Sequence, residues 1–242
     1  MRSLRGLVHG APRLLSVTAQ TDETTNAKKH LPLWQETLLM LVVATVLAVL
    51  IKAFFVQAFY IPSESMEPQF VHLDRILVQK VSYWGGEPER GEIVVFKDPD
   101  HWLPPQPEST GLKRAMEIIG LYPTGGHLVK RVIGVGGDRV KCCDTQGRIT
   151  VNGTPLDEPY LPKGTDPSLQ PFDVKVPADH LWMMGDNRGN SADSRAHLGQ
   201  PGGGFVATDE VVGKVFALVW PLSRFQIIRM PGTFDKVADP TP

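Results

Sequence analysis

A β fold is indicated most clearly by the run Leu128-Val129-Lys130-Arg131-Val132-Ile133-Gly134, in which aliphatic residues surround two cations. Valine and isoleucine favour extended backbone, so residues 126–135 predict a strand. Successive side chains of a strand point to opposite faces, so Lys130 faces the same way as its aliphatic neighbours two residues away, and Arg131 faces the opposite way. We expect Lys130 to lie inward among aliphatic side chains and Arg131 to point outward and stay charged.

Further strand candidates lie on both sides of this run. They are residues 75–81, 92–96, 148–154, 172–176, 180–184 and 211–220. Within one of them, Asn152-Gly153 suits the two-residue turn of a hairpin, because both residues tolerate positive φ angles. The 23 glycines and 21 prolines of the chain also suit turns between short strands. Many short strands and few helices predict a mostly β chain with an antiparallel β-sheet domain.

An apolar stretch near the N-terminus predicts a helix that spans a membrane. Residues 37–51 carry no charge, and after Lys52 the sequence is again largely apolar. Residues 37–58 in a helix would extend for about 33 Å, enough to cross a hydrocarbon core of about 30 Å. We therefore expect one transmembrane helix over residues 37–59. Two alternatives stay open: a buried core helix, and a cleaved signal peptide, since Val56-Gln57-Ala58 resembles a small-residue cleavage site.

Charge around this stretch predicts its direction in the membrane. The basic residues before it are Arg2, Arg5, Arg13, Lys28 and Lys29. A basic excess beside a span is typical of its cytoplasmic side. We therefore expect a cytoplasmic tail over residues 1–36, an extracytoplasmic β-rich domain over 60–230 and an exposed C-terminal tail over 231–242. Within the domain, we interpret residues 101–126 as an insertion between strands, with a short helix candidate at 112–121.

Bulk properties exclude several classes of function. The formal net charge of −1 gives no electrostatic basis for nucleic-acid binding. The two cysteines, Cys142 and Cys143, are adjacent, and no cluster with the ligand spacing of a zinc site accompanies them. We expect neither a metal nor a nucleic-acid partner. Whether the cysteines are free thiols or form a strained vicinal disulfide stays open.

Two serines lie directly after the apolar stretch, within Phe59-Tyr60-Ile61-Pro62-Ser63-Glu64-Ser65-Met66-Glu67-Pro68. A serine hydroxyl attacks an amide only when a base removes its proton. The seven histidines show no recognisable histidine–aspartate arrangement, which leaves a lysine as the alternative base. Burial among aliphatic side chains disfavours the ammonium form and lowers a lysine pKa from its reference value of about 10.4. Lys130 has that setting in the sequence.

A third polar stretch follows later in the chain: Gly185-Asp186-Asn187-Arg188-Gly189-Asn190-Ser191-Ala192-Asp193-Ser194-Arg195. Together with the serine motif and the strand of Lys130, in this order, it resembles the bacterial type I (leader) signal peptidase family. The resemblance extends from the apolar span to about Trp220 and implies a Ser–Lys dyad serine protease. In that family, the serine that matches Ser65 is the nucleophile, and the lysine that matches Lys130 is its base.

The resemblance also implies roles for neighbouring residues. Ser63 matches a serine whose hydroxyl helps to bind the oxyanion, and Ser191 matches one that hydrogen-bonds the lysine amine. Asp193 and Arg195 match an ion pair that braces the site. The residues that we expect to form the walls of the substrate pocket are Ile61, Pro62, Met66, Val132 and Ile133. Shallow apolar pockets would select small side chains at the first and third residues before the cut.

The function implied by the resemblance is a membrane-bound endopeptidase that removes signal peptides from exported preproteins after an Ala-x-Ala-like site. It implies no metal or organic cofactor. The expected partners are signal peptides of secreted preproteins, the lipid bilayer and the protein export machinery. The expected location is the plasma membrane of a bacterium, crossed once, with the catalytic domain outside the cytoplasm.

Two other functions are compatible with parts of the sequence. One is a Ser–Lys protease with a narrower range of substrates. The other is a membrane-anchored β module that binds signal peptides without cleaving them. The joint presence of all six motif residues disfavours the second alternative, because a degenerate copy is expected to lose one or more of them.

Overall fold

A computed structural model describes residues 32–99, 102–104, 111 and 125–240. Most of the expected N-terminal tail and the short helix expected at 112–121 therefore lie outside the described residues. The chain divides into two units, Met1–Leu41 and Val42–Pro242.

The long apolar helix α1 (Leu33–Phe54) begins four residues before the expected start at Thr37 and ends five residues before the expected end at Phe59. Its stretch Leu33–Ile51 has a mean hydropathy of 2.0, and none of it is buried, unlike the core helix of a soluble protein. By length and composition this stretch is able to cross a membrane. A signal sequence near an N-terminus passes the same test.

Residues 56–59, which we expected to complete the helix, lie in the strand β1 (Val56–Tyr60) instead. β1 pairs antiparallel with β2 (Arg75–Gln79) over its whole length. Valine, phenylalanine and tyrosine favour extended backbone, and Phe59 is buried in the core. The apolar residues after Phe54 therefore belong to the sheet, and hydropathy alone does not separate the two elements.

The remaining strands and the short 3₁₀ helices are distributed along the rest of the chain. The strands are β3 (Ile93–Lys97), β4 (His127–Gly134), β5 (Arg139–Cys142), β6 (Ile149–Val151), β7 (Thr154–Pro155), β8 (Phe172–Lys175), β9 (His180–Met184), β10 (Val206–Ala207), β11 (Val211–Trp220) and β12 (Gln226–Ile227). The 3₁₀ helices are η1 (Val81–Tyr83), η2 (Thr208–Glu210), η3 (Leu222–Arg224) and η4 (Gly232–Phe234).

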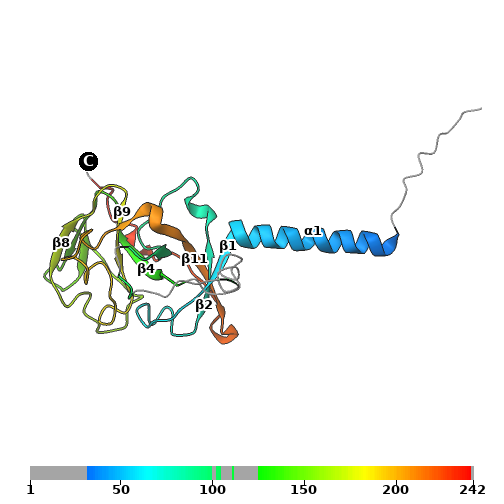
Figure 1. The fold of residues 1–242 in the computed structure, drawn as a ribbon. Coiled ribbons are helices and arrows are strands. Elements are labelled where there is room, and N and C mark those ends of the chain that lie inside the picture. Colours follow the sequence, from blue (N-terminus) through cyan, green and yellow to red (C-terminus); the bar gives the residue numbers. More distant parts are fainter. Residues whose placement is uncertain (1–31, 100–101, 105–110, 112–124, 241–242) are drawn as a thin grey trace, which may run out of the picture. The chain divides into compact units, whose positions relative to one another are not determined.

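Two antiparallel sheets form the domain. Among the described residues, the larger sheet has the strand order β1-β2-β11-β3-β4-β9-β10, and β12 pairs with β11. The smaller sheet has the order β7-β6-β5-β8 and lies at the opposite end of the domain from β1 and β2 (Figure 1). The mostly β, antiparallel fold predicted from the sequence is confirmed.

Several observed strands match the residue ranges that the sequence predicted. β9 and β11 coincide with the predicted ranges, and β4 lies within 126–135. Asn152 and Gly153 have φ angles of 51° and 80° and form the turn between β6 and β7, as predicted. The strands β5, β10 and β12 were not predicted, because each has only two to four residues and little apolar alternation.

β4 is covered on both faces, and this coverage buries the lysine of the sequence motif. Leu128 and Val132 pack in a core cluster with residues of β3 and β9. Ile133 packs in a different cluster, which joins the two sheets through Trp182 and Val140. With aliphatic side chains on both sides, neither face of the second half of β4 is open to water.

The C-terminal segment packs onto the domain, and the exposed tail expected over residues 231–242 is therefore wrong for its described part. Phe234 and Val237 are buried against the cluster beneath the smaller sheet. The Ala238 carbonyl accepts hydrogen bonds from Arg90 and Asn152. Two apolar side chains separated by polar residues give no strand or helix pattern, so the sequence did not reveal this contact.

Cys142 ends β5 and is joined to Cys143 by a disulfide in the structure. Cys142 is also part of the core cluster beneath the smaller sheet. Of the two states that the sequence left open, the structure contains the vicinal disulfide.

Replacement of Phe234 by alanine is expected to destabilise the domain. The phenylalanine is 8% exposed, and loss of a buried aromatic ring costs about 3 kcal/mol or more of unfolding free energy. The matched control is Phe225→Ala, because Phe225 is 59% exposed. Urea denaturation of the full chain in detergent micelles measures both variants. Equal, small losses in the two variants would contradict the packed position of the C-terminal segment.

Candidate active site

The side chains of Ser65 and Lys130 meet although they lie 65 residues apart in the chain. Ser65 lies in the turn after β1, and Lys130 lies on β4. The Lys130 Nζ donates a hydrogen bond of 2.6 Å to the Ser65 Oγ. Ser65 is 7% exposed and Lys130 is 3% exposed. The sequence prediction that these two residues belong to one site agrees with this geometry.

The turn that carries Ser65 is held in place by buried apolar residues. Met66 and Phe70 are both buried in the core cluster of the larger sheet, and the Phe70 amide donates to the Met66 carbonyl. The Ile61 amide bonds the Asp74 carbonyl and closes the base of the turn at 2.9 Å. The serine therefore projects from a fixed backbone.

The pKa of Lys130 is lowered from 10.5 to about 8. Burial is the main cause, because it disfavours the charged ammonium. The carboxylates of Asp193 and Asp186 act in the opposite direction, and the nearby Arg195 guanidinium lowers the pKa further. A substantial fraction of the amine is therefore neutral at mildly alkaline pH, and a neutral amine is able to accept a proton from a serine hydroxyl.

Ser63 lies beside the nucleophile candidate. Its Oγ is 3.2 Å from the Ser65 Oγ, and both side chains line the same cavity. A hydroxyl at this place is able to donate a hydrogen bond to an oxygen that develops negative charge near Ser65.

The loop after β9 clamps the backbone of the Ser65 turn. The Asn187 amide donates to the Ser65 carbonyl at 3.1 Å, and the Asn187 side-chain amide donates to the Glu64 carbonyl at 3.1 Å. Gly185 lies so close that a Cβ at this position would come within 2.3 Å of the Ser65 carbonyl oxygen. The sequence predicts no role for Asn187, because a contact with the main chain of a distant segment leaves no pattern in the sequence.

Ser191 does not make the hydrogen bond to Lys130 that the family resemblance implied. Its Oγ is buried and lacks a partner of hydrogen-bonding geometry among the described residues. It lies close to Gly185, where a Cβ would be 2.3 Å from this Oγ. It is also near enough to Asp193 to favour the ionised form of that carboxyl slightly.

Asp193 and Arg195 form the expected ion pair. The Arg195 Nε and terminal amine donate to the two carboxylate oxygens at 2.9 and 2.7 Å. The Gly185 amide donates to the same carboxylate at 2.9 Å, which ties the start of the loop to its end. Burial alone would raise the pKa of Asp193, but the hydrogen bonds and charge of Arg195 hold it below its ordinary value.

Arg131 is buried, so the expectation that it points to solvent is wrong. It is 2% exposed and donates two hydrogen bonds to Asp186, at 2.8 and 2.6 Å. Its guanidinium also lies 4.0 Å from the centre of the Tyr160 ring. Alternation does place Arg131 on the face of β4 opposite Lys130, but that face is covered by the loop after β9, which supplies the compensating carboxylate of Asp186.

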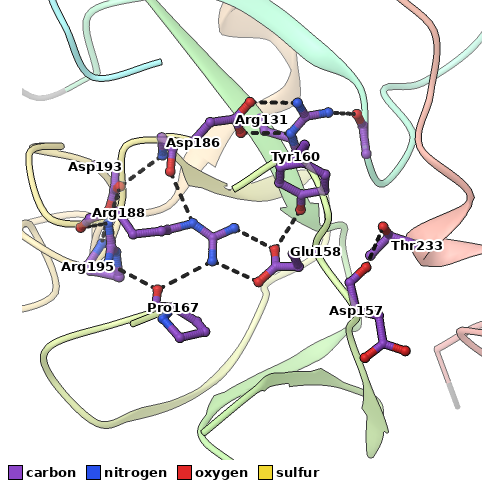
Figure 2. Close-up of polar contacts among 12 residues, drawn as sticks. Arg131, Asp157, Glu158, Tyr160, Pro167, Asp186, Arg188, Asp193, Arg195 and Thr233 are labelled. Carbon is purple, nitrogen blue, oxygen red and sulfur yellow. Dashed lines mark hydrogen bonds and ion pairs between the residues drawn. The ribbon is translucent and has the colours of Figure 1, made fainter. Parts of the chain in front are cut away.

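Arg188 and Glu158 form a third buried ion pair behind the loop, at 2.9 and 2.5 Å (Figure 2). The Tyr160 hydroxyl donates to the same carboxylate at 2.6 Å. Arg188 and Arg195 both donate to the Pro167 carbonyl, at 3.3 and 3.4 Å. The segment from 158 to 167 therefore supports the loop that carries Asp193, a role that the sequence did not indicate.

A cavity of about 330 Å³ opens onto Ser65 and Lys130. Three of the five expected pocket residues, Ile61, Pro62 and Met66, line it. Val132 and Ile133 do not, because this half of β4 pairs with β9 and its side chains fill the core. Larger cavities, of about 1110 and 840 Å³, lie elsewhere in the domain and contain neither residue of the serine–lysine pair.

No group of three or more side chains suited to holding a metal ion occurs within the described part of the chain. The polar side chains that line the cavity are the hydroxyls of Tyr60, Ser63 and Ser65, the imidazole of His127 and the amine of Lys130, and a serine beside an amine suits acyl chemistry.

Comparisons with known proteins agree with the motifs. A family model described as "Signal peptidase, peptidase S26" matches residues 34–220. The chain is 39% identical to "Signal peptidase I" of Mycobacterium tuberculosis (strain CDC 1551 / Oshkosh), over 88% of this chain and 81% of that protein. It is 36% identical to "Probable signal peptidase I" of Mycobacterium leprae, over 87% of each. It is 33% identical to "Signal peptidase I S" of Bacillus subtilis, over 74% and 85%.

Glu158→Gln is expected to destabilise the domain by about 3 kcal/mol, because it leaves the Arg188 guanidinium buried without its carboxylate. The control is Asp173→Asn, which breaks a two-bond pair of the same chemistry with Arg139 at the surface and should change stability little. Urea denaturation of the full chain in micelles measures both. A loss in Glu158→Gln no greater than in the control would show that the buried pair does not support the loop.

Proposed function

The chain belongs to the peptidase S26 family of signal peptidases, and we propose that it is a membrane-bound serine endopeptidase that cleaves signal peptides from exported preproteins after an Ala-x-Ala-like site. The observation that carries this proposal is the 2.6 Å hydrogen bond from the buried Lys130 amine to the Ser65 hydroxyl. A lysine held against a serine, with a pKa lowered to about 8, is suited to act as its base.

In the proposed mechanism, the neutral Lys130 amine takes the Ser65 hydroxyl proton while the Oγ attacks the carbonyl carbon of the residue before the cut. The Ser63 hydroxyl and the Ser65 amide donate to the oxyanion of the tetrahedral intermediate. The Lys130 ammonium then gives its proton to the leaving amine. A water molecule, activated by the same amine, hydrolyses the Ser65 ester and releases the signal peptide. This chemistry needs no metal or organic cofactor.

The preprotein would enter the cavity as an extended strand. β3 pairs with residues 127–131 of β4 on one side, but β9 pairs with β4 only from Arg131 onward on the other, and residues 127–130 line the cavity. Residues 59–66 form the other side. An extended peptide between these segments would place the side chains of its first and third residues before the cut on one side, because strand side chains alternate.

The apolar helix α1 fits a membrane-anchored protein. We further propose that the protein crosses the plasma membrane of a bacterium once, with its N-terminus in the cytoplasm, because basic residues precede the apolar stretch. Phe54 and Phe55, which are about half exposed, would rest at the lipid surface. Phe59 does not share this role, since it is buried in the core. Contact with the export machinery belongs to the same proposal.

Ser65→Ala and Lys130→Ala are each expected to abolish cleavage of a preprotein with an Ala-x-Ala site. Each change removes a reacting group, so the rate should fall by about 10³-fold or more. The control for the lysine is Lys175→Ala, an exposed lysine on β8, and circular dichroism verifies folding of each variant. Mass spectrometry of the products locates the cut.

Two results of this experiment would contradict the proposal. Retained activity in either variant would exclude the dyad. No cleavage by folded wild-type protein would favour the narrow-substrate protease or the non-cleaving β module instead.

The rate of cleavage should depend on pH through the protonation of Lys130. Its pKa in the folded protein is about 8, so the ammonium dominates below that pH and cannot accept the serine proton. We expect kcat/KM to rise about tenfold per pH unit on the acid side and to level off above pH about 8. Circular dichroism at each pH controls for unfolding. A flat profile from about pH 5 to 9 would contradict a lysine base.

A further inference from the structure

One residue that lines the active-site cavity, Leu103, lies outside the three sequence motifs. Among the described residues, the lining side chains belong to residues 59–66, to residues 125–130, and to Leu103 alone from the early part of the insertion. Leu103 is partly buried and packs against the core cluster that contains Phe96 and Leu128. Leu103 is therefore an apolar residue that lines the cavity and also packs against the core.

The backbone at Leu103 is fixed by the carboxylate of Asp98. The Trp102 amide donates to this carboxylate at 2.7 Å, and the Leu103 amide donates to both of its oxygens, at 3.1 and 3.3 Å. The Asp98 amide in turn donates to the Gly126 carbonyl at 2.9 Å. These bonds fasten the start of the insertion to the beginning of β4.

Trp102 is fixed by a stacked ring. Its indole lies parallel to the imidazole of His197, with ring centres 4.2 Å apart and an angle of 4° between the planes. The Phe96 ring meets the same indole edge-on at 6.0 Å. The His197 Nδ1 donates to the Asp193 carbonyl at 2.8 Å, since a carbonyl oxygen only accepts. Leu103 is therefore coupled to the loop that braces the lysine.

The place of Leu103 along the cavity follows from strand geometry. Asp98, whose carboxylate binds the Leu103 amide, is itself bonded to Gly126, and the next residue, His127, lies three residues from Lys130, or about 10 Å along β4. In a peptide strand bound at Ser65, the third residue before the cut lies about 7 Å from the first, on the same side. A signal peptide that reaches Ser65 from the Gly126 end of the cavity would bring its third residue before the cut toward Leu103.

We propose that Leu103 is a specificity-determining residue that restricts the third residue before the cut to a small side chain, and that the stack of Trp102 on His197 positions it. Gly125 and Gly126 line the same end and contribute no side chains, so the side chains that limit the space there are Leu103 and the packed rings of Phe59 and His127. This inference rests on the proposed function and adds a residue that none of the sequence motifs contains.

The test compares substrates within one enzyme preparation, so that the fraction of folded protein cancels. Three preproteins are used: one with Ala-x-Ala, one with leucine as the third residue before the cut, and one with leucine as the first. For Leu103→Ala in the full, detergent-solubilised chain, we expect kcat/KM for the second substrate, relative to the first, to rise about tenfold or more. The ratio of the third substrate to the first should stay as in the wild type.

Three further variants separate this effect from a general loosening of the domain. Leu169→Ala removes a leucine that is 74% exposed and does not line the cavity, so its ratios should equal those of the wild type. His197→Ala removes the stack and should shift the ratios in the same direction as Leu103→Ala. His197→Phe retains an aromatic ring against Trp102 and should restore the wild-type preference. A purely structural role of His197 would lower all three rates together.

Each outcome decides between the two proposals. If the wild type cleaves the Ala-x-Ala preprotein and Leu103→Ala keeps the wild-type ratios, the role of Leu103 is overturned and the peptidase stands. If the ratio changes for the first residue instead of the third, the placement of Leu103 is overturned. If the folded wild type cleaves no Ala-x-Ala preprotein, the proposed function fails, and this inference fails with it.

Discussion

The site depends on one physical constraint: an amine must be shielded from water beside a serine hydroxyl, so that its pKa falls far enough for a usable fraction of it to be neutral. A lowering of the Lys130 pKa from 10.5 to about 8 corresponds to about 3 kcal/mol against its ammonium form. Water would remove this penalty, so the lysine needs packing on every side. The larger sheet provides it, because β4 is an inner strand between β3 and β9 and carries aliphatic residues on both faces. The buried turn residues Met66 and Phe70 then hold the serine against the amine.

The charged groups near Lys130 are paired, so they do not cancel the lowering of its pKa by burial. An unpaired carboxylate beside Lys130 would stabilise its ammonium and raise its pKa. The nearby carboxylates are instead each bonded to an arginine: Asp193 to Arg195, and Asp186 to Arg131. A third pair, Glu158 with Arg188, backs the same loop (Figure 2). The pairs thus fix the loop by directional hydrogen bonds while each leaves little net charge at the amine. The proposed dyad requires both a fixed loop and little net charge beside the Lys130 amine.

The sequence predicted the elements whose patterns are local, and it did not predict contacts between distant segments. β9, β11 and the Asn152-Gly153 turn followed from alternation and turn chemistry. Ser65 and Lys130 were paired through the family resemblance, since nothing in either local sequence identifies the other. Arg131 was placed outward because its partner Asp186 lies 55 residues away. The helix end, the packing of Phe234 and the stack of Trp102 on His197 likewise depend on tertiary contacts that no local pattern encodes.

The proposed mechanism depends on the protonation state of the Lys130 amine, and NMR observes this state directly. The full chain is labelled with ¹³C at the lysine ε-carbons, and the Lys130 resonance is assigned by its absence in Lys130→Arg. Titration of that resonance in micelles measures the pKa without reference to any substrate. We expect a midpoint of about 8, well below the ordinary lysine value of 10.5. A midpoint near the ordinary value of 10.5 would show that burial does not lower the pKa and that almost no neutral amine exists at pH 8, which would contradict the role of Lys130 as the base.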